Sequence, residues 1–266
     1  MADNSETPSP QSIITDALKR QVFLVQDYSL LAMRSIANLF TPPQYWLDTL
    51  EQMDVIGVGS LSIVLISAFF IGAVLVLQTA SQFERFGSTA ITGDVVSLAL
   101  VRELGPTITA LLIAGRNASG IASELGSMVV TEQVDAMRAL GTDPTRKLVT
   151  PRVVATVLML PLLVAVADFV GLLGGLVMST LSLQLSAVQF WTHAINALAF
   201  GDLVQGFGKP VVFGFIISTV ACFEGLRVRG GTQGVGRATT SAVVMSSVIV
   251  LVVDSFLAKV FLFMFK

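Results

Sequence analysis

Four charged side chains interrupt stretches of the sequence that are otherwise apolar: Arg102, Glu103, Lys209 and Asp254. A charge placed in membrane hydrocarbon costs about 2.5–3.5 kcal/mol, so such side chains usually face protein or water. The four formal charges sum to zero, which favours mutual neutralisation between helices. Arg102 and Glu103 are adjacent, so on a helix they point in different directions and cannot pair side by side. We therefore expect each of them to find its partner on another helix.

This intramembrane charge cluster has two interpretations that the sequence leaves open. It is either a structural network that fixes the register of the helices, or a polar patch at the mouth of an outward-facing cavity where a polar headgroup would bind. Asp168 is a further acidic residue in an apolar stretch. A buried partner and a water-lined groove are both consistent with it.

Other candidate chemistry is poorly supported. The segment 231–238 (GTQGVGRA) nearly matches a phosphate-binding loop, but Arg237 replaces the lysine and Ala238 replaces the hydroxyl residue. His193 is the only histidine and has no acid–serine arrangement near it in the sequence. Cys222 is the only cysteine, which excludes an intrachain disulfide and a cysteine-cluster metal site. We predict a chain without catalytic residues, metal site or cofactor of its own.

The composition is that of a membrane protein. Only 13% of the 266 residues are charged and 53% are hydrophobic, whereas soluble domains carry about 25% charged residues. A net charge of −2 without a long basic tract gives no indication of a nucleic-acid partner.

Five apolar stretches have the roughly 20 residues that a bilayer requires. We therefore predict an all-α polytopic membrane protein. The predicted spans are Val55–Thr79, Val95–Ala114, Val153–Ser179, Leu203–Leu226 and about Ser241–Phe265. The segment Leu181–Asp202 is amphipathic and is expected at the membrane surface. A glycine-rich turn, residues 227–240, is expected before the last span.

The sequence divides into three parts. Residues 1–11 are polar and are predicted to be a disordered tail. Residues 12–54 are predicted to form interfacial helices, with a charged helical pattern that ends at Thr41-Pro42-Pro43 and aromatic anchors at Tyr45 and Trp46. Residues 55–266 are predicted to form the five-helix transmembrane domain.

Between the second and third spans lies a region, Ser119–Arg152, that reads as an amphipathic helix outside the membrane. Gly141 is a plausible C-terminal cap. Such a helix either only joins two spans or docks onto a soluble partner with its charged face. The apolar face is predicted to hold Val130, Val134, Met137 and Leu140, and the charged face Thr131, Glu132, Asp135 and Arg138.

The basic residues predict the orientation. Five of them lie between Arg116 and Arg152 and three between Arg227 and Arg237, whereas the turn after the first span has only Arg85 and the turn after the third has none. The positive-inside rule places the two basic regions and the N-terminus in the cytoplasm. An odd number of spans then places Lys266 on the periplasmic side.

The block from Leu100 to Pro144, LVRELGPTITALLIAGRNASGIASELGSMVVTEQVDAMRALGTDP, resembles the signature region of the MlaE family, the permeases of ABC transporters associated with MCE proteins. The segments Phe70–Gln78 and Gly234–Leu257 resemble the first and last spans of that family. The resemblance covers about Pro42 to the C-terminus.

The resemblance implies an N-terminal elbow helix, five transmembrane helices and a homodimer in the bacterial inner membrane. It further implies two cytoplasmic ATPase subunits, which carry ATP and magnesium, and a periplasmic MCE-domain protein. The substrate would be a membrane lipid, typically a phospholipid, in a cavity at the dimer interface. The residues implied for lipid contact are Val74, Leu75, Leu77, Gln78 and Leu100, with Arg102 and Glu103 close by, and those implied for coupling to the ATPase are Glu132, Asp135 and Arg138. Asp168 has no counterpart in the family pattern.

Two other functions compete with a lipid-transporting permease. A membrane-embedded enzyme that modifies lipids would need a convergent nucleophile or metal set, which the sequence does not offer. An ion-coupled secondary transporter would use the intramembrane charges as a proton relay, but usually shows two repeated halves, and no internal repeat is visible. A co-purifying ATPase and bound lipid would separate the three.

Overall fold

The structure is a computed structural model that describes residues 10–84 and 91–265. Every regular element in these two ranges is helical, as the sequence predicts. The N-terminal helices are α1 (Pro10–Leu39), α2 (Trp46–Ile56) and the short η1 (Val58–Ser60), followed by α3 (Leu61–Glu84). The remainder consists of α4 (Thr92–Ala99), η3 (Leu100–Leu104), α5 (Gly105–Ile113), η4 (Ala114–Ala118), α6 (Ser119–Val130), α7 (Gln133–Ala139), η5 (Thr145–Val149), α8 (Thr150–Leu183), α9 (Ala187–Asn196), α10 (Phe200–Leu226) and α11 (Gly231–Met264).

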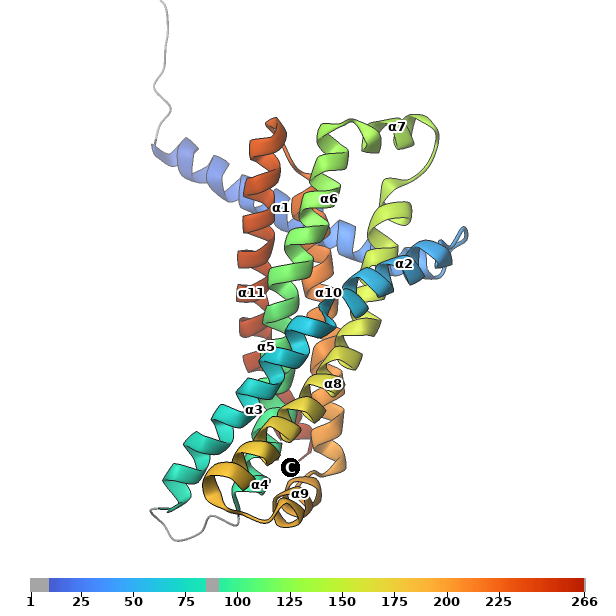
Figure 1. The fold of residues 1–266 in the computed structure, drawn as a ribbon. Helices are drawn as coiled ribbons and strands as arrows, with labels where there is room; N and C mark the ends of the chain where they lie inside the picture. The colour runs from blue at the N-terminus through green and yellow to red at the C-terminus, as the bar shows by residue number, and fades with distance from the viewer. Residues whose placement is uncertain (1–9, 85–90, 266) are drawn as a thin grey trace, which may run out of the picture.

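Five helical runs within the described ranges are long and apolar enough to cross a membrane, which confirms the predicted number. They are Trp46–Glu84, Thr92–Val130, Thr145–Ser182, Phe200–Leu226 and Gly231–Met264. The runs stand side by side as a bundle, with α1 and α7 toward one end and α4 and α9 at the other (Figure 1). The segment expected at the surface forms the short α9, which is not among the five. The predicted disordered tail falls almost wholly on residues 1–9, outside the described ranges.

The spans pack through small residues. A Cβ atom added to Gly72 of α3 would lie 1.8 Å from the carbonyl oxygen of Gly171 on α8, and one added to Gly174 would lie 2.0 Å from the carbonyl oxygen of Phe69. Only glycine allows the two backbones to approach this closely. The close approach at Gly72, Gly171 and Gly174 therefore joins α8 to α3.

The main core lies between α8, α10, α6 and the middle of the second run. Buried apolar side chains from these helices form one continuous cluster, which includes Ile113, Leu125, Leu160, Phe213 and Ile217. In contrast, few residues in the most apolar part of α11 are fully buried, and one face of it exposes Val244, Val248 and Leu251. Its exposed face is therefore available to lipid or to another protein.

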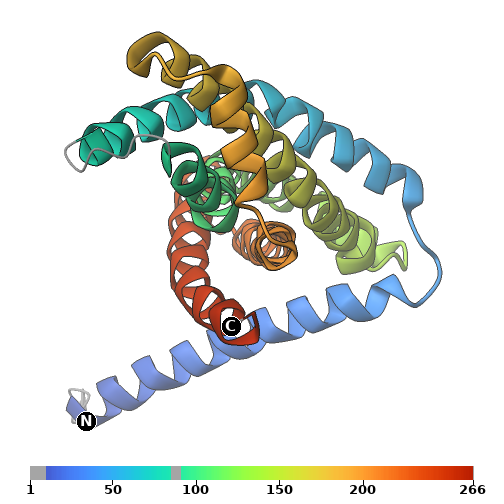
Figure 2. The same ribbon diagram turned by 90° about the horizontal axis from the view of Figure 1, so that it is seen from below.

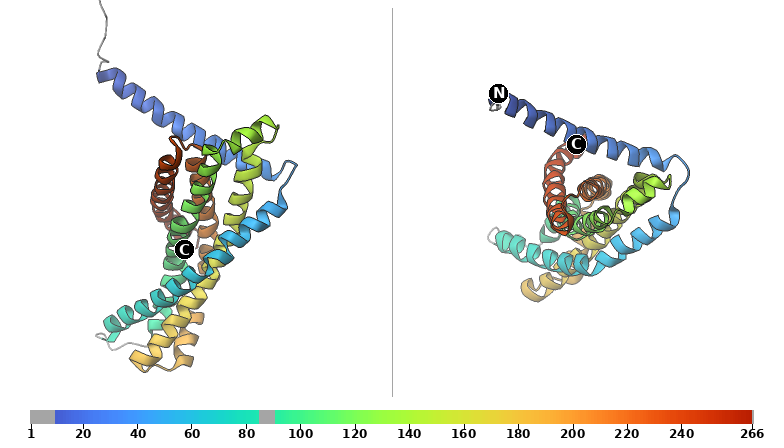
Figure 3. Two further views of the ribbon diagram at one scale, coloured as in Figure 1. Left: turned by 45° about the horizontal axis from the view of Figure 1, so that its top comes forward. Right: turned by 90° about the horizontal axis from the view of Figure 1, so that it is seen from above.

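Helix α1 crosses the bundle instead of running along it (Figure 2). Figure 3 shows that α1 passes the bundle at the end where α6 leads into α7. Its middle is fixed by Tyr28, whose hydroxyl lies 2.9 Å from the Thr219 hydroxyl of α10 and whose ring contacts Phe223 edge-on at 5.6 Å. Burial raises the pKa of the Tyr28 phenol above its ordinary value, so this side chain is neutral.

The boundaries of the second and fifth spans differ most from those predicted. The second run does not end at Ala114, because Ser119–Val130 continues it as α6 and buries Ile121, Ala122 and Leu125 against its neighbours. The expectation of one amphipathic helix over Ser119–Arg152 is therefore wrong, since only α7 is a separate helix. The last run begins at Gly231, so the glycine-rich segment is largely helical and not a turn.

Candidate functional site

Lys209 is the centre of a buried charge cluster between α10, α11 and the second run. Its side chain is completely buried, and its Nζ lies 2.6 Å from Glu103 Oε2 and 3.1 Å from Asp254 Oδ1. The same Nζ donates a hydrogen bond to the Arg102 carbonyl oxygen at 3.0 Å. Thr107 donates from its hydroxyl to the other oxygen of Asp254 at 2.9 Å. Three of the four predicted cluster residues thus meet, on three different runs of helix.

Arg102 turns away from this cluster, although its backbone carbonyl belongs to it. Its Nε lies 2.5 Å from Oδ1 of Asp202, which is buried in the first turn of α10. The second oxygen of Asp202 accepts a hydrogen bond from the Ala199 backbone N–H at 2.8 Å. Sequence reasoning did not select Asp202 as a partner because it stands at the edge of the fourth span. The position of Asp202 could have drawn attention to it, since an acidic residue in the first turn of a helix commonly takes part in capping.

Arg102 and Glu103 both lie in a π-helical turn, η3, and their side chains point in different directions. Such turns insert one extra residue into a helix and are frequent at functional sites. Here the turn sends Arg102 toward the start of α10 and Glu103 toward Lys209. Both guanidinium and carboxylate remain nearly half exposed, at 43% and 45%. The site therefore combines a fully buried cation with two charged groups that reach the surface of the chain.

Asp168 lies next to the same π-helical turn. A Cβ atom added to Gly105 would fall 1.7 Å from Asp168 Oδ1, so this glycine makes room for the carboxylate. Within the described residues that buried oxygen has no hydrogen-bond partner. Asp168 also borders a small apolar cavity of about 190 Å³ together with Val101, Phe169 and Phe207. It does not join the charge cluster.

An apolar groove of about 320 Å³ runs along α3 beside η3. Its lining residues are Phe70, Ile71, Val74, Leu75, Gln78 and Leu104. The groove thus gathers Val74, Leu75 and Gln78 of the residues implied for lipid contact. Leu77 is exposed on another part of α3, whereas Leu100 is 3% exposed and packs in a core cluster with Val76 and Phe190. Leu104 of the groove directly follows Glu103 in the sequence, and both belong to η3.

The short helix α7 follows a sharp bend at Glu132, whose φ of +60° is left-handed and rare for a residue with a side chain. Arg138 and Asp135 form an exposed ion pair at 2.8 Å. The helix ends in a Schellman motif, in which Gly141 has φ of +79° and the N–H of Thr142 donates to the Met137 carbonyl at 3.0 Å. The predicted cap at Gly141 is confirmed.

The two faces of α7 follow the prediction only in part. Val134 is buried and Met137 packs against the main core, as expected for an apolar face. Leu140 is 84% exposed, so its assignment to the packed face is wrong. The Schellman bend carries this side chain past the end of the helix and away from the bundle.

The structure also shows where the two motifs lie for which the sequence offers little support. The segment 231–238 forms the first two turns of α11 and follows α10, not a strand. His193 Nδ1 lies 3.2 Å from both carboxylate oxygens of Asp94, a contact that joins α9 to α4. Among the described residues, no three histidine, cysteine, aspartate or glutamate side chains are close enough to hold a metal ion.

Comparison with known proteins gives consistent results over most of the chain. The family model for permease MlaE matches residues 49–260. A probable ABC transporter permease protein of Rickettsia felis is 40% identical over 237 residues, which cover 89% of this chain and 92% of the relative. A probable ABC transporter permease protein of Synechocystis is 42% identical over 240 residues, covering 86% and 91%. The intermembrane phospholipid transport system permease protein MlaE of Haemophilus influenzae is 36% identical over 211 residues, covering 79% and 81%.

Proposed function

The chain belongs to the MlaE permease family, and from this we propose that it is the membrane subunit of an ABC transporter that moves phospholipid between the inner membrane and the periplasm or outer membrane. The observation that carries the proposal is the apolar groove of α3, whose lining residue Leu104 lies in the same η3 turn as the half-exposed Glu103. A lipid needs an apolar wall for its acyl chains and polar groups for its head, and this arrangement offers both. The phospholipid named for the Haemophilus relative supports the same substrate class.

We propose that the permease works as a homodimer in which two such grooves face a common cavity. Val74, Leu75 and Gln78 would contact acyl chains, and Glu103 and Arg102 would meet the headgroup. Leu100, which is buried, would reach lipid only if a helix movement exposed it, whereas Leu77 is exposed outside the groove. The exposed faces of α3 and α11 are consistent with a partner in the membrane.

We propose that energy comes from cytoplasmic ATPase subunits, which bind ATP and magnesium, and that α7 is the coupling helix. Glu132, Asp135 and Arg138 lie on or just before α7 at the end of the bundle where α1 crosses. Their exposed charges, together with Leu140, would form the contact with the ATPase. A periplasmic MCE-domain protein would collect or deliver the lipid at the opposite end, near α4 and α9.

The decisive experiment measures ATP-dependent lipid transfer. The permease is co-expressed with its ATPase, and the complex is reconstituted in liposomes. Wild type should transfer labelled phospholipid to acceptor vesicles. The transfer rate of the variant Glu103→Gln should be at least tenfold lower, although the variant still assembles with the ATPase. Assembly should survive because Lys209 keeps Asp254 as a partner. The control variant Glu51→Gln changes an exposed glutamate of α2 and should transfer lipid normally.

Three results would contradict the proposal. Unchanged transfer by Glu103→Gln would exclude the headgroup role of this carboxylate. Lipid movement that follows a proton gradient without ATP would indicate a secondary transporter. Chemical change of the lipid by the purified chain would indicate an enzyme.

A further inference from the structure

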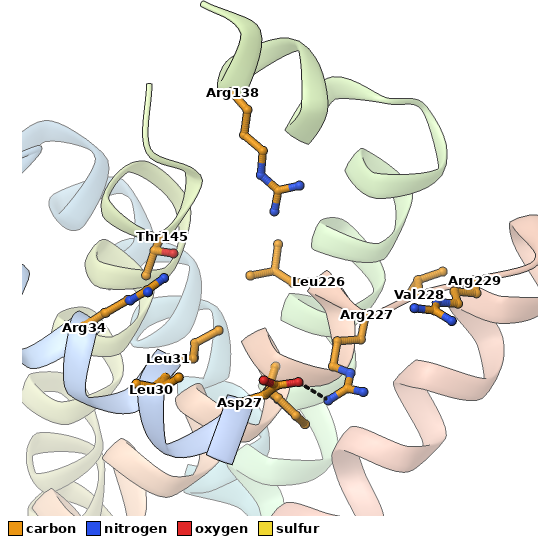
Figure 4. A pocket seen from close by; sticks show the side chains of 11 residues that line it. Asp27, Leu30, Leu31, Arg34, Arg138, Thr145, Leu226, Arg227, Val228 and Arg229 are labelled. Carbon is orange, nitrogen blue, oxygen red and sulfur yellow. Dashed lines mark hydrogen bonds and ion pairs between the residues drawn. The ribbon is translucent and has the colours of Figure 1, made fainter. Parts of the chain in front are cut away.

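A large cavity lies away from the charge cluster, at the end of the bundle where α1 crosses. It measures about 720 Å³ and opens between α1, α7, η5 and the turn that joins α10 to α11 (Figure 4). The side chains that line it come from segments up to about 200 positions apart in the sequence. None of them belongs to the groove of α3 or to the buried charge cluster.

Arginine dominates the charged groups of this cavity. Four arginines line it, Arg34, Arg138, Arg227 and Arg229, against one acid, Asp27. In Figure 4 only Asp27 and Arg227 are joined, through a contact of 3.5 Å. Arg138 forms an ion pair at 2.8 Å with Asp135 of the same helix. Within the described residues no ion pair is formed by Arg34 or Arg229, so two guanidinium groups remain free for a ligand.

The rest of the lining is apolar. Leu30 and Leu31 come from α1, Phe223 and Leu226 from the end of α10, and Val228 from the turn that follows. The apolar surface continues beyond the cavity along α1, where Val22, Phe23, Met33 and Ile36 are exposed. A ligand that fits both parts has an anionic head and an apolar tail.

We propose that this cavity binds the phosphate headgroup of an anionic phospholipid from the leaflet on the side of α1. Guanidinium groups bind phosphate through paired, charge-assisted hydrogen bonds. Basic pockets between membrane helices on the cytoplasmic side are typical sites for anionic headgroups. A bound headgroup bridges α1, α7 and the α10–α11 turn, and the acyl chains lie along the apolar face of α1.

This site is separate from the transport groove. A lipid held here is a resident lipid that fixes α7 to the rest of the permease, and not the transported molecule. The inference uses the proposed orientation, in which α1 lies along the cytoplasmic surface, but it does not depend on which lipid is transported. Its failure would leave the transfer experiment with Glu103→Gln unaffected.

The test compares lipid retention by the detergent-purified complex in native mass spectrometry. Wild type should retain phosphatidylglycerol at least tenfold more strongly than phosphatidylcholine. The double variant Arg34→Gln/Arg229→Gln should lose that preference, because it removes the two arginines without a partner. The matched control Arg237→Gln removes an arginine of α11 that does not line the cavity and should keep the preference.

Two further arms identify the ligand. Glycerol 3-phosphate should compete weakly, since it has the phosphate but no acyl chains; competition as strong as that of the lipid would indicate a free-phosphate site and overturn the proposal. Phosphatidylglycerol with a photoreactive group near its head should crosslink to peptides that contain residues 27–34 or 223–229.

Equal retention of phosphatidylglycerol by the double variant would refute the assignment. So would crosslinks confined to α3 or η3, because the lipid would then occupy the transport groove. If the double variant instead loses its ATPase subunit while lipid retention is unchanged, the cavity is a protein contact and not a lipid site.

Discussion

Lys209 is the residue on which the buried charges depend. Two carboxylates converge on its ammonium group, at 2.6 and 3.1 Å, and the side chain has no contact with solvent. A charge at this depth is tolerated only because it is paired and hydrogen-bonded. The arrangement explains how a helix that must lie in hydrocarbon can carry a lysine at all.

The variant Lys209→Ala should therefore be strongly destabilised. It leaves Glu103 and Asp254 as neighbouring negative charges without a cation, a change that costs about 3–5 kcal/mol in buried pairs. We expect a clear fall in the melting temperature of the detergent-purified protein, measured by size-exclusion chromatography after heating. Lys259→Ala, which truncates an exposed lysine of α11, is the control and should melt like wild type. Equal melting of the two variants would show that the cluster contributes nothing to stability.

At the scale of elements, the arrangement depends on how closely α3 and α8 approach. The two helices meet at glycine positions on both sides, where backbone atoms of one helix occupy the space of a missing side chain on the other. This contact places the groove of α3 beside η3, because α8 is also packed against the second run. The geometry of the groove is thus set by residues that do not line it.

Replacement of Gly174 by alanine should separate the two helices. The new methyl group would lie 2.0 Å from the Phe69 carbonyl oxygen, and backbone cannot yield as a flexible side chain does. Overpacking of this kind costs about 1–3 kcal/mol. The matched control is Gly120→Ala on α6, where a Cβ atom meets nothing within 4 Å and alanine favours the helix.

We expect Gly174→Ala to melt several degrees below wild type and Gly120→Ala to melt at or above it. The same thermal assay serves for both. A Gly174→Ala protein as stable as the control would mean that α3 and α8 are not in contact as the structure describes.

At the scale of the whole molecule, the ends of the bundle differ in character. One end carries α1, α7 and the arginine-lined cavity, and the other carries α4 and α9 (Figure 1). This asymmetry agrees with the distribution of basic residues in the sequence, which predicts a cytoplasmic N-terminus and a periplasmic C-terminus. The proposed ATPase and MCE partners would then act at opposite ends.

Single cysteines test this topology in a Cys222→Ala background. A cysteine at Leu140 should react with a membrane-impermeant maleimide only in inside-out vesicles, and its labelling should fall when the ATPase is bound. A cysteine at Gln189, which is exposed on α9, should react only in intact spheroplasts. Labelling of both from the same side would refute the five-span topology, and unprotected Leu140→Cys would argue against α7 as the coupling helix.

The sequence by itself determined the class of the protein, the number of spans and the need for charge pairing. Membrane spans are encoded locally, since 20 apolar residues can satisfy their backbone hydrogen bonds within one helix. The cap at Gly141 was predictable from local sequence as well, because a single glycine carries the signal.

Only the tertiary structure decided where these elements end and which charges meet. Asp202 became the partner of Arg102 because a π-helical turn redirects that side chain, and no local pattern announces such a turn. Ser119–Val130 joined the second span because neighbouring helices bury Ile121, Ala122 and Leu125. The glycine-rich start of α11 joined the last span although only Gly234 and Ala238 are buried there. The arginine-lined cavity likewise exists only where α1 crosses the bundle, since its arginines are distant in the sequence and converge through packing alone.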